Sequence, residues 1–277
     1  MRFVGLREDD DHTVIGVVRG DAVTPLAPVR DFYADLPKWR AAAAEVPTGE
    51  RPLDTAPLAP PVPPAARVLC LGLNYRKHAE EGVYGVPDHP TIFGRWTASL
   101  SVGGVPVRVP ANEPGLDWEG EVAAVVGAPL ADAEPDEAEA AVLGYATFND
   151  ITARTAQKLT AQWTLGKNVD GSGPMGPIVT ADETGPLSGG LRLTTRVNGT
   201  VVQEGDTRDL IFGVGEVLSL ISRTLRLHPG DVLVTGTPDG VGYVRTPPWL
   251  LNDGDVVEVE VDRLGVLRTP VVGARSR

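Results

Sequence analysis

Cysteine is nearly absent from this chain, which contains a single thiol, that of Cys70. One thiol excludes a disulfide framework within the chain and also excludes a zinc finger built on cysteines. The residue lies in the apolar run Val68-Leu69-Cys70-Leu71-Gly72. This context predicts a thiol buried in the core and not a nucleophile.

Long apolar runs and an excess of basic residues are also lacking. The apolar stretch Val122 to Ala131, among the longest without charge or strong polarity, is far too short to span a bilayer. Residues 1–11 contain no apolar segment typical of a signal peptide, so we expect a cytoplasmic protein. The net charge of −12 argues against a nucleic-acid partner and against adhesion to an anionic membrane, because both depend on clustered Lys and Arg.

Glycine and proline, in contrast, are abundant, with 32 and 25 residues among 277. Such a composition favours turns and strands over long helices. The length suits one large domain, or a catalytic domain with a small partner. Short apolar runs alternate with turn signals, and this alternation predicts a β-dominated α+β fold.

The first 64 residues are predicted to form a small N-terminal α+β domain with a linker, and residues 65–277 the main domain. Two β-rich runs, Thr13–Arg19 and Ala22–Leu26, fit a hairpin. The segment Pro47–Pro64 contains seven prolines, so we expect it to be extended and not to join a sheet. We interpret it as a linker, although an ordered segment lying across the main domain fits equally well.

Further strands and a few helices are expected in both units. Asn198-Gly199 between two β-rich runs is a strong hairpin signal. The other expected strands are Val68–Leu73, Val105–Val109, Glu121–Gly127, Gly144–Asn149, Leu191–Val197, Thr200–Gln203, Asp231–Thr235 and Val256–Val261. The expected helices are Asp31–Leu36, Trp39–Val46, Tyr75–Glu81, Asp136–Ala141, Ala153–Gln162 and Val214–Leu225.

Two glutamates with one residue between them occur at Glu119 and Glu121. On a strand such residues face the same side, and two adjacent carboxylates repel unless a cation compensates them. A divalent ion would do so, and oxygen ligands select Mg²⁺, Mn²⁺ or Ca²⁺ over Zn²⁺. The pair Glu258 and Glu260 has the same spacing, and there we predict a solvated strand face. Periodicity alone does not separate the two pairs.

Other candidate residues admit both a functional and a structural interpretation. Asp150 could be a third metal ligand or the cap of a helix that begins at Ile151. His78 and Glu81, three apart on a predicted helix, suit a general base oriented by a carboxylate, or a surface charge pair. Lys167 is one of only four lysines and could equally be a surface residue.

The segment Thr235–Gly242, rich in small residues, follows a predicted strand. It could bring backbone N–H groups close to an anion, or simply form a tight turn. Gly-x-Ser-x-Gly, Walker A and dinucleotide-binding motifs are missing from the sequence.

The order of these motifs carries more information than any one of them. The chain resembles the fumarylacetoacetate hydrolase family over about residues 68–270, and residues 1–60 resemble a variable small domain that many bacterial members carry. The motifs that carry the resemblance are Leu71-Gly72-Leu73-Asn74-Tyr75-Arg76-Lys77-His78-Ala79-Glu80-Glu81, Glu119-Gly120-Glu121, Asn149-Asp150-Ile151-Thr152-Ala153-Arg154, Trp163-Thr164-Leu165-Gly166-Lys167, Val197-Asn198-Gly199 and Gly236-Thr237-Pro238-Asp239-Gly240-Val241-Gly242.

The resemblance implies a mixed β-sandwich roll, a homodimer and a site for Mg²⁺ or Mn²⁺, with Ca²⁺ able to replace them in crystals. It assigns residue roles by position in the motifs. The metal ligands would be Glu119, Glu121 and Asp150. His78 and Glu81 would form the dyad that activates water or moves a proton, and Lys167 would contact the substrate oxygens. Further substrate contacts would be Tyr75, Arg95, Arg154, Gln157, Gly236 and Thr237.

The activity that the resemblance implies starts from a 2-keto or diketo acid chelated by the metal. We expect hydrolysis of a C–C bond in an acylpyruvate-type substrate, with the metal stabilising an enolate. The alternative on the same site is an isomerase, tautomerase or decarboxylase of a 2-keto (di)carboxylic acid. A lesser alternative is a non-catalytic protein that binds a ligand.

One motif departs from the family pattern. Arg95 and Trp96 stand where many members have lysine followed by proline. A planar guanidinium and an added aromatic surface there predict a larger or more aromatic substrate than the commonest acylpyruvates. The glycines and proline around Tyr84–Pro90 suit a mobile loop near the dyad.

Overall fold

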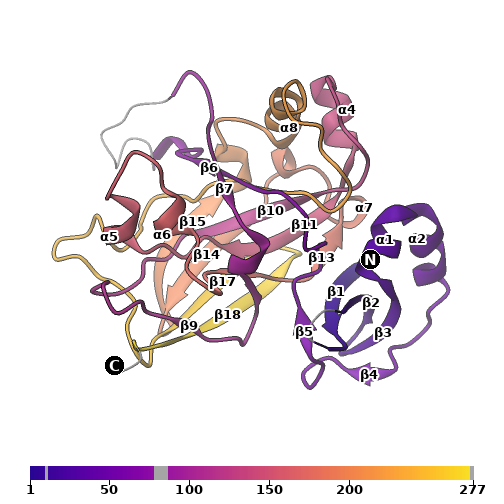
Figure 1. The fold of residues 1–277 in the computed structure, drawn as a ribbon, viewed down its shortest axis with the longest axis horizontal. Coiled ribbons are helices and arrows are strands. Elements are labelled where there is room, and N and C mark those ends of the chain that lie inside the picture. The colour runs from indigo at the N-terminus through magenta and orange to yellow at the C-terminus, as the bar shows by residue number, and fades with distance from the viewer. Residues whose placement is uncertain (10–11, 78–86, 275–277) are drawn as a thin grey trace.

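The computed structural model describes residues 1–9, 12–77 and 87–274 of the chain. Its centre is a large mixed sheet, against which a smaller sheet packs, with short helices around the edges (Figure 1). This arrangement confirms the predicted β-dominated α+β class.

The large sheet runs through both the N-terminal unit and the main part of the chain. Its pairs are antiparallel except for β16 with β6 and β12 with β8, which are parallel. In spatial order its main path is β4 (Arg51–Pro52), β3 (Ala22–Pro28), β2 (Thr13–Arg19), β1 (Arg2–Arg7), β13 (Ile178–Thr180), β11 (Val142–Asn149), β10 (Gly120–Val126), β16 (Val232–Val234), β6 (Val68–Gly72) and β7 (Thr91–Arg95), with β5 (Leu58–Ala59), β8 (Leu100–Val102) and β12 (Gly173–Met175) paired beside it.

The smaller sheet supplies the second layer behind the candidate site. Its hairpin turns at Asn198 and Gly199, whose φ angles of 50° and 80° suit the tight turn predicted for Asn-Gly. Its strands in spatial order are β15 (Thr200–Asp206), β14 (Arg192–Val197), β17 (Val256–Val261), β18 (Gly265–Val272) and β9 (Val107–Arg108).

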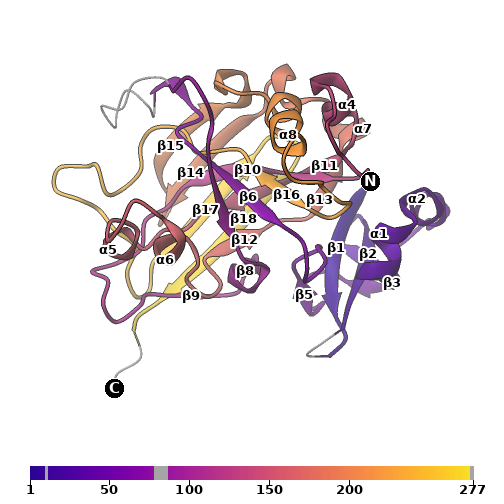
Figure 2. The same ribbon diagram turned by 45° about the horizontal axis from the view of Figure 1, so that its top comes forward.

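The helices are short and lie at the periphery. Helices α4 and α8 lie side by side at one edge of the molecule, and α5 and α6 lie together at another (Figures 1 and 2). The α-helices are α1 (Val29–Ala34), α2 (Leu36–Ala44), α4 (Pro135–Ala140), α5 (Arg154–Gln157), α6 (Thr164–Lys167), α7 (Ala181–Thr184) and α8 (Val214–Ser222), and the 3-10 turns are η1 (Thr97–Ser99), η2 (Leu187–Gly189) and η3 (Thr207–Asp209).

The proline-rich segment corrects one expectation. It joins the large sheet at two short strands, because β4 pairs with β3 and β5 pairs with β1. The prolines lie between or at the ends of these pairings, where a missing N–H breaks few ladder bonds. The hydroxyl of Tyr33 also donates to the carbonyl of Pro61 at 2.6 Å. The segment is therefore an ordered part of the N-terminal unit. The division of the chain at residue 64 stays a prediction.

The helix predicted over Ala153–Gln162 is shorter in the structure. The helix α5 ends at Gln157, and the hydroxyl of Thr160 then accepts the backbone N–H of Gln162 at 3.1 Å. Such local side-chain bonds compete with helical ones, and this one lies where the predicted helix would have continued. The helix predicted over Tyr75–Glu81 lies partly outside the described residues, as does the Tyr84–Pro90 loop.

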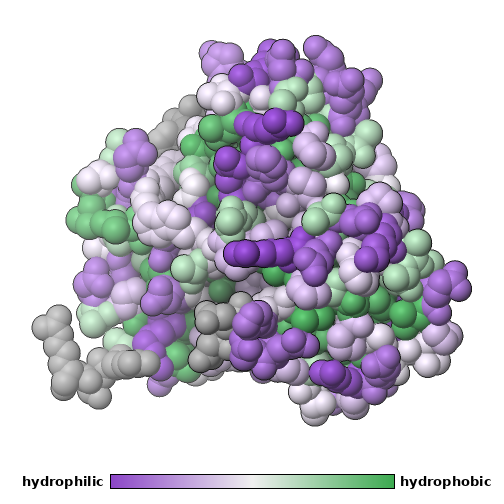
Figure 3. Space-filling view, turned by 45° about the vertical axis from the view of Figure 1, so that its right-hand side comes forward, coloured by the Kyte–Doolittle hydropathy of each residue, from purple (hydrophilic) through white to green (hydrophobic). Residues whose placement is uncertain are grey.

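Two expectations about burial are confirmed. Cys70 is fully buried among core residues such as Phe148. On β17, Glu260 is exposed and Glu258 half-buried, and both pair with arginines of neighbouring strands. In the space-filling view, hydrophilic side chains are spread over much of one face of the molecule (Figure 3). Within residues 1–9, 12–77 and 87–274, the structure contains no helix that is long and apolar enough to cross a membrane.

Candidate active site

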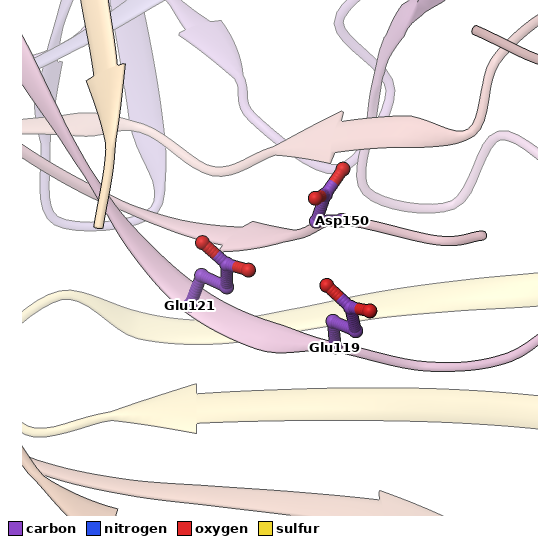
Figure 4. Close-up of side chains that lie close together, drawn as sticks. All are labelled: Glu119, Glu121 and Asp150. Carbon is purple, nitrogen blue, oxygen red and sulfur yellow. The ribbon is translucent and has the colours of Figure 1, made fainter. Parts of the chain in front are cut away.

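Three buried carboxylates meet at the ends of β10 and β11. Glu119, Glu121 and Asp150 each offer an oxygen atom, and these atoms all lie within 4.8 Å of one another (Figure 4). All three residues are buried, with exposed fractions of 7%, 1% and 0%. The structure thus selects this glutamate pair, and not the solvated pair on β17, as the one that meets a third carboxylate.

Strand pairing brings these carboxylates together. Gly120 pairs with Asn149 in the antiparallel ladder, so Asp150, one residue on, lies beside Glu119. The backbone N–H of Asp150 donates to the Glu119 carbonyl at 2.9 Å. Asp150 is therefore no helix cap, since the next helix, α5, starts at Arg154.

Glycine is required between the two glutamates. A Cβ atom on Gly120 would lie 2.2 Å from the hydroxyl of Thr195 on the smaller sheet. The Glu-Gly-Glu sequence therefore lets two sheets approach on one face of β10 while both carboxylates extend from the other face.

Lys167 is placed among the carboxylates. Its ammonium donates to Glu119 Oε2 at 2.7 Å and to Asp150 Oδ2 at 2.6 Å. Burial by itself would lower the pKa of Lys167, but the charges of Asp150 and Glu119 outweigh burial and raise it. Of the two interpretations of Lys167, the structure excludes the surface lysine, because the residue is 2% exposed.

Glu121 has a different environment. Its Oε2 accepts the backbone N–H of Gly236 at 2.6 Å, whereas its buried Oε1 has no hydrogen-bond partner among the described residues. Burial, and then the nearby charges of Asp150 and Glu119, raise the pKa of Glu121 well above its usual value. An unpartnered buried carboxylate oxygen beside two further carboxylates fits a hard divalent cation.

Arg154 links the carboxylates to the loop after β16. Its guanidinium lies 2.6 Å from Glu119 Oε1 and 2.8 Å from Asp117 Oδ2. Asp117 also accepts the backbone N–H groups of Gly242 and Tyr243 at 2.7 and 3.2 Å. Burial would lower the pKa of Arg154, but the charges of Asp117 and Glu119 raise it.

A cavity of about 550 Å³ opens above these groups. That volume suits a small organic ligand. Its lining combines apolar, aromatic and cationic side chains, and consists of Leu71, Gly72, Leu73, Thr91, Phe93, Glu119, Arg154, Gln157, Lys158, Thr160, Trp163, Lys167, Thr237, Val241, Tyr243 and Val244.

The predicted substrate contacts divide into two groups. Arg154, Gln157 and Thr237 line the cavity. Gly236 lies beside it, with its N–H engaged by Glu121 and with φ at +89°. The Thr237 hydroxyl donates to the Gly120 carbonyl and accepts from Gln203, so its hydrogen bonds are to protein groups.

Arg95 and Tyr75 are not among the lining residues. The guanidinium of Arg95 lies behind Asp150, with hydrogen bonds to Asp150 and to the Ser172 hydroxyl. Arg95 thus positions the Asp150 carboxylate from the side that faces away from the cavity. The buried hydroxyl of Tyr75 has no hydrogen-bond partner among the described residues, and burial raises its pKa.

The prediction of a larger or more aromatic substrate depended partly on Trp96. This residue is 61% exposed and is not among the residues that line the cavity. His78 and Glu81 lie outside the described residues. Their proposed dyad is therefore a prediction from the sequence.

Sequence reasoning missed the residues that hold the site from behind. Asp117 lies two residues before Glu119 and could have been singled out by that spacing. Gln203 accepts the N–H of Gly120 and donates to Thr237, and Glu113 accepts the first N–H groups of α5. Nothing local marks Gln203 and Glu113, because their partners are distant in sequence.

Several curated relatives of the chain are named as tautomerases. The chain is 36% identical over 214 residues to the oxaloacetate tautomerase fahd2 of Xenopus laevis, covering 76% of this chain and 67% of the relative. It is also 36% identical over 215 residues to the oxaloacetate tautomerase YisK of Bacillus subtilis, covering 76% and 71%.

Solved structures agree with this relationship. The fold matches that of a 2-hydroxyhepta-2,4-diene-1,7-dioate isomerase from Mycobacterium marinum, with a TM-score of 0.78, 31% identity and full coverage of both chains. These names support the isomerase or tautomerase alternative better than the hydrolase that we expected first. Residues 67–272 match the family described as Fumarylacetoacetate (FAA) hydrolase C-terminal, and the chain belongs to that family of enzymes.

Proposed function

We propose that the protein is a metal-dependent tautomerase or isomerase that interconverts the enol and keto forms of a 2-keto acid. The observation that carries this proposal is the buried carboxylate triad below a small cavity, with the Lys167 ammonium against two of its members. The names of the relatives favour this reaction class over C–C hydrolysis.

The residues present fit a divalent ion. Glu119, Glu121 and Asp150 would hold it, and oxygen ligands alone favour Mg²⁺ or Mn²⁺. When bound, the ion supplies a Lewis acid for the carboxylate and keto oxygens of the substrate. Glu121 Oε1, which has no hydrogen-bond partner among the described residues, supports this assignment independently of any relative.

The remaining side chains bind and orient the substrate. Lys167 and Arg154 place positive charge on the same side of the cavity as the carboxylates, where substrate oxygens would carry negative charge. The amide of Gln157, which accepts from Arg154 at 2.9 Å, adds a neutral hydrogen-bonding group. Phe93 and Trp163, in edge-to-face contact, form an apolar wall that limits water.

A proton must move from the enol oxygen to the carbon atom next to the enol carbon, at the other end of the C=C bond, or in the reverse direction. We assign this transfer to His78, oriented by Glu81, because the resemblance places a proton-moving dyad at these residues. Replacing His78 with alanine should leave metal binding intact and abolish turnover.

Three further properties belong to this proposal. We infer a homodimer from the family resemblance, and a cytoplasmic location from the sequence. We also infer Mg²⁺ as the ion used, with Mn²⁺ as a substitute. Gel filtration with light scattering measures the first, and metal analysis after purification the last.

The test compares reactions on one protein preparation. Metal-stripped protein with Mg²⁺ restored is offered enol oxaloacetate, and the loss of the enol absorbance is followed against the uncatalysed rate. Acetylpyruvate is offered in parallel and followed by proton NMR. We expect faster loss of the enol that depends on Mg²⁺, with acetylpyruvate intact. Acetate and pyruvate from acetylpyruvate, without faster enol loss, would restore the hydrolase; pyruvate from oxaloacetate would indicate a decarboxylase.

A further inference from the structure

In the part of the chain that the structure describes, three cationic side chains line the cavity, and they differ in how their charge is compensated. Arg154 pairs with Asp117 and Glu119, and Lys167 pairs with Glu119 and Asp150. Lys158 also lines the cavity, yet no carboxylate of the described residues lies within ion-pair distance of it. Among residues 1–9, 12–77 and 87–274, no carboxylate therefore neutralises this charge in the cavity.

The position of Lys158 is defined by an aromatic ring. Its ammonium nitrogen lies 3.6 Å from the ring centroid of Tyr243, and the Arg154 guanidinium lies 5.2 Å from the same ring. Cation–π contacts favour this placement without neutralising the charge. Tyr243 is itself held by its backbone N–H on Asp117.

The helix α5 sets the direction from the carboxylate triad to Lys158. Arg154 and Lys158 are four residues apart, so they lie on one face of the turn and about 6 Å apart along its axis. Arg154 contacts the metal-ligand candidate Glu119. Lys158 thus presents a cation one helical turn away from the expected position of the 2-keto acid group.

We propose that Lys158, supported by Tyr243, binds a second carboxylate at the far end of the substrate. In a dicarboxylic 2-keto acid such as oxaloacetate, the first carboxylate and the keto oxygen would face the triad, and the second carboxylate would meet Lys158. This inference rests on the proposed function and adds to it the residue that distinguishes dicarboxylic from monocarboxylic acids.

The test measures binding and needs no turnover. Two 2-keto acids with equal carbon chains, 2-oxoglutarate and 2-oxopentanoate, differ at the end that would meet Lys158. Their dissociation constants for the Mg²⁺-loaded protein are measured by calorimetry in the wild type and in K158Q and K158R. The variant K38Q is the matched control, because Lys38 also lies over an aromatic ring, that of Trp39, but in the N-terminal helix α2.

We expect the wild type to bind 2-oxoglutarate about tenfold more tightly than 2-oxopentanoate, which corresponds to about 1.4 kcal/mol. K158Q should bind both acids equally, while K158R and K38Q keep the preference. Equal binding of the two acids by the wild type, or an unchanged preference in K158Q, would overturn the inference. A retained preference in a protein that does not accelerate enol loss would reject only the proposed reaction.

Discussion

The ammonium nitrogen of Lys167 lies 2.7 Å from Glu119 Oε2 and 2.6 Å from Asp150 Oδ2, in a site where all three side chains are at least nine-tenths buried. Two of the three carboxylates of the triad therefore share one lysine. The charge of Glu121 is compensated least, because only a backbone N–H contacts its carboxylate in the described part of the chain. This asymmetry leads to different expectations for lysine and glutamate variants.

Replacing Lys167 with methionine removes a buried cation and leaves its carboxylate partners uncompensated. Loss of one partner of a buried ion pair costs about 3–5 kcal/mol. We expect a loss of that order in the free energy of unfolding without divalent ions, and a much smaller loss at saturating Mg²⁺. Denaturant unfolding with and without Mg²⁺ measures both. An equal loss under the two conditions would mean that no ion compensates the carboxylates.

Replacing Glu121 with glutamine keeps the size of the side chain but removes a proposed metal ligand. Loss of a side chain that only hydrogen-bonds to a metal ligand lowers metal affinity about 10–100-fold. Because Glu121 is proposed as a ligand itself, we expect the affinity of the variant to fall by about 100-fold or more. The thermal midpoint without metal should stay or rise, because repulsion among three carboxylates decreases. Calorimetric titration with Mg²⁺ or Mn²⁺ measures affinity.

Glu258→Gln is the control for that variant, since Glu258 belongs to the identically spaced pair on β17 and forms an ion pair with Arg268 at the surface. It should bind metal as the wild type does. An E121Q protein with unchanged affinity would remove Glu121 from the metal site.

Replacing Asp117 with asparagine should disturb Arg154 and the loop at 242–243 together, because one carboxylate accepts hydrogen bonds from both. An amide places a donor against at least one of these N–H groups, at a cost of about 1–3 kcal/mol in stability. We also expect a lower kcat/KM with metal affinity nearly unchanged. Asp262→Asn, which changes an exposed partner of Arg192, should alter stability by less than about 0.5 kcal/mol. Equal effects of the two variants would contradict the linking role of Asp117.

Cys70 should be inert in the folded protein. Burial, and then the nearby charge of Asp150, raise the pKa of its thiol well above the usual value, so the reactive thiolate is scarce at neutral pH. A thiol-specific chromogenic reagent should react with one equivalent only after denaturant is added. Rapid reaction in native buffer would show that the core around β6 opens.

The local features of the sequence predicted several parts of this structure well. The turn at Asn198-Gly199 needs positive φ angles that these residues tolerate, so neighbours matter little there. Along β17 the valines on one face are buried and the glutamates on the other face are the less buried residues, as the alternation of Val and Glu predicted. The motif order identified the family, since each motif keeps its place relative to the others.

Other features depended on contacts between distant segments. The helix over 153–162 was predicted too long, since α5 ends at Gln157 and the chain then forms a local turn at Thr160 and Gln162. The proline-rich segment joined the sheet because two positions beside it were open: the outer edge of β3, and the end of β1 beyond its short pairing with β13. Arg95 was assigned to the substrate, but the fold places Asp150 and Ser172 around it.

The sequence by itself determined the turns, the buried thiol, the strand-rich class and the two candidate glutamate pairs, because these depend on backbone preferences and on alternation along one strand. Only the tertiary structure decided which pair forms a site. The antiparallel pairing of β10 with β11 brings Asp150 to Glu119 and Glu121, and Lys167 arrives from a helix 17 residues further along. Identical spacing cannot distinguish the pairs, since the electrostatic environment of a carboxylate is set by groups that approach it through space.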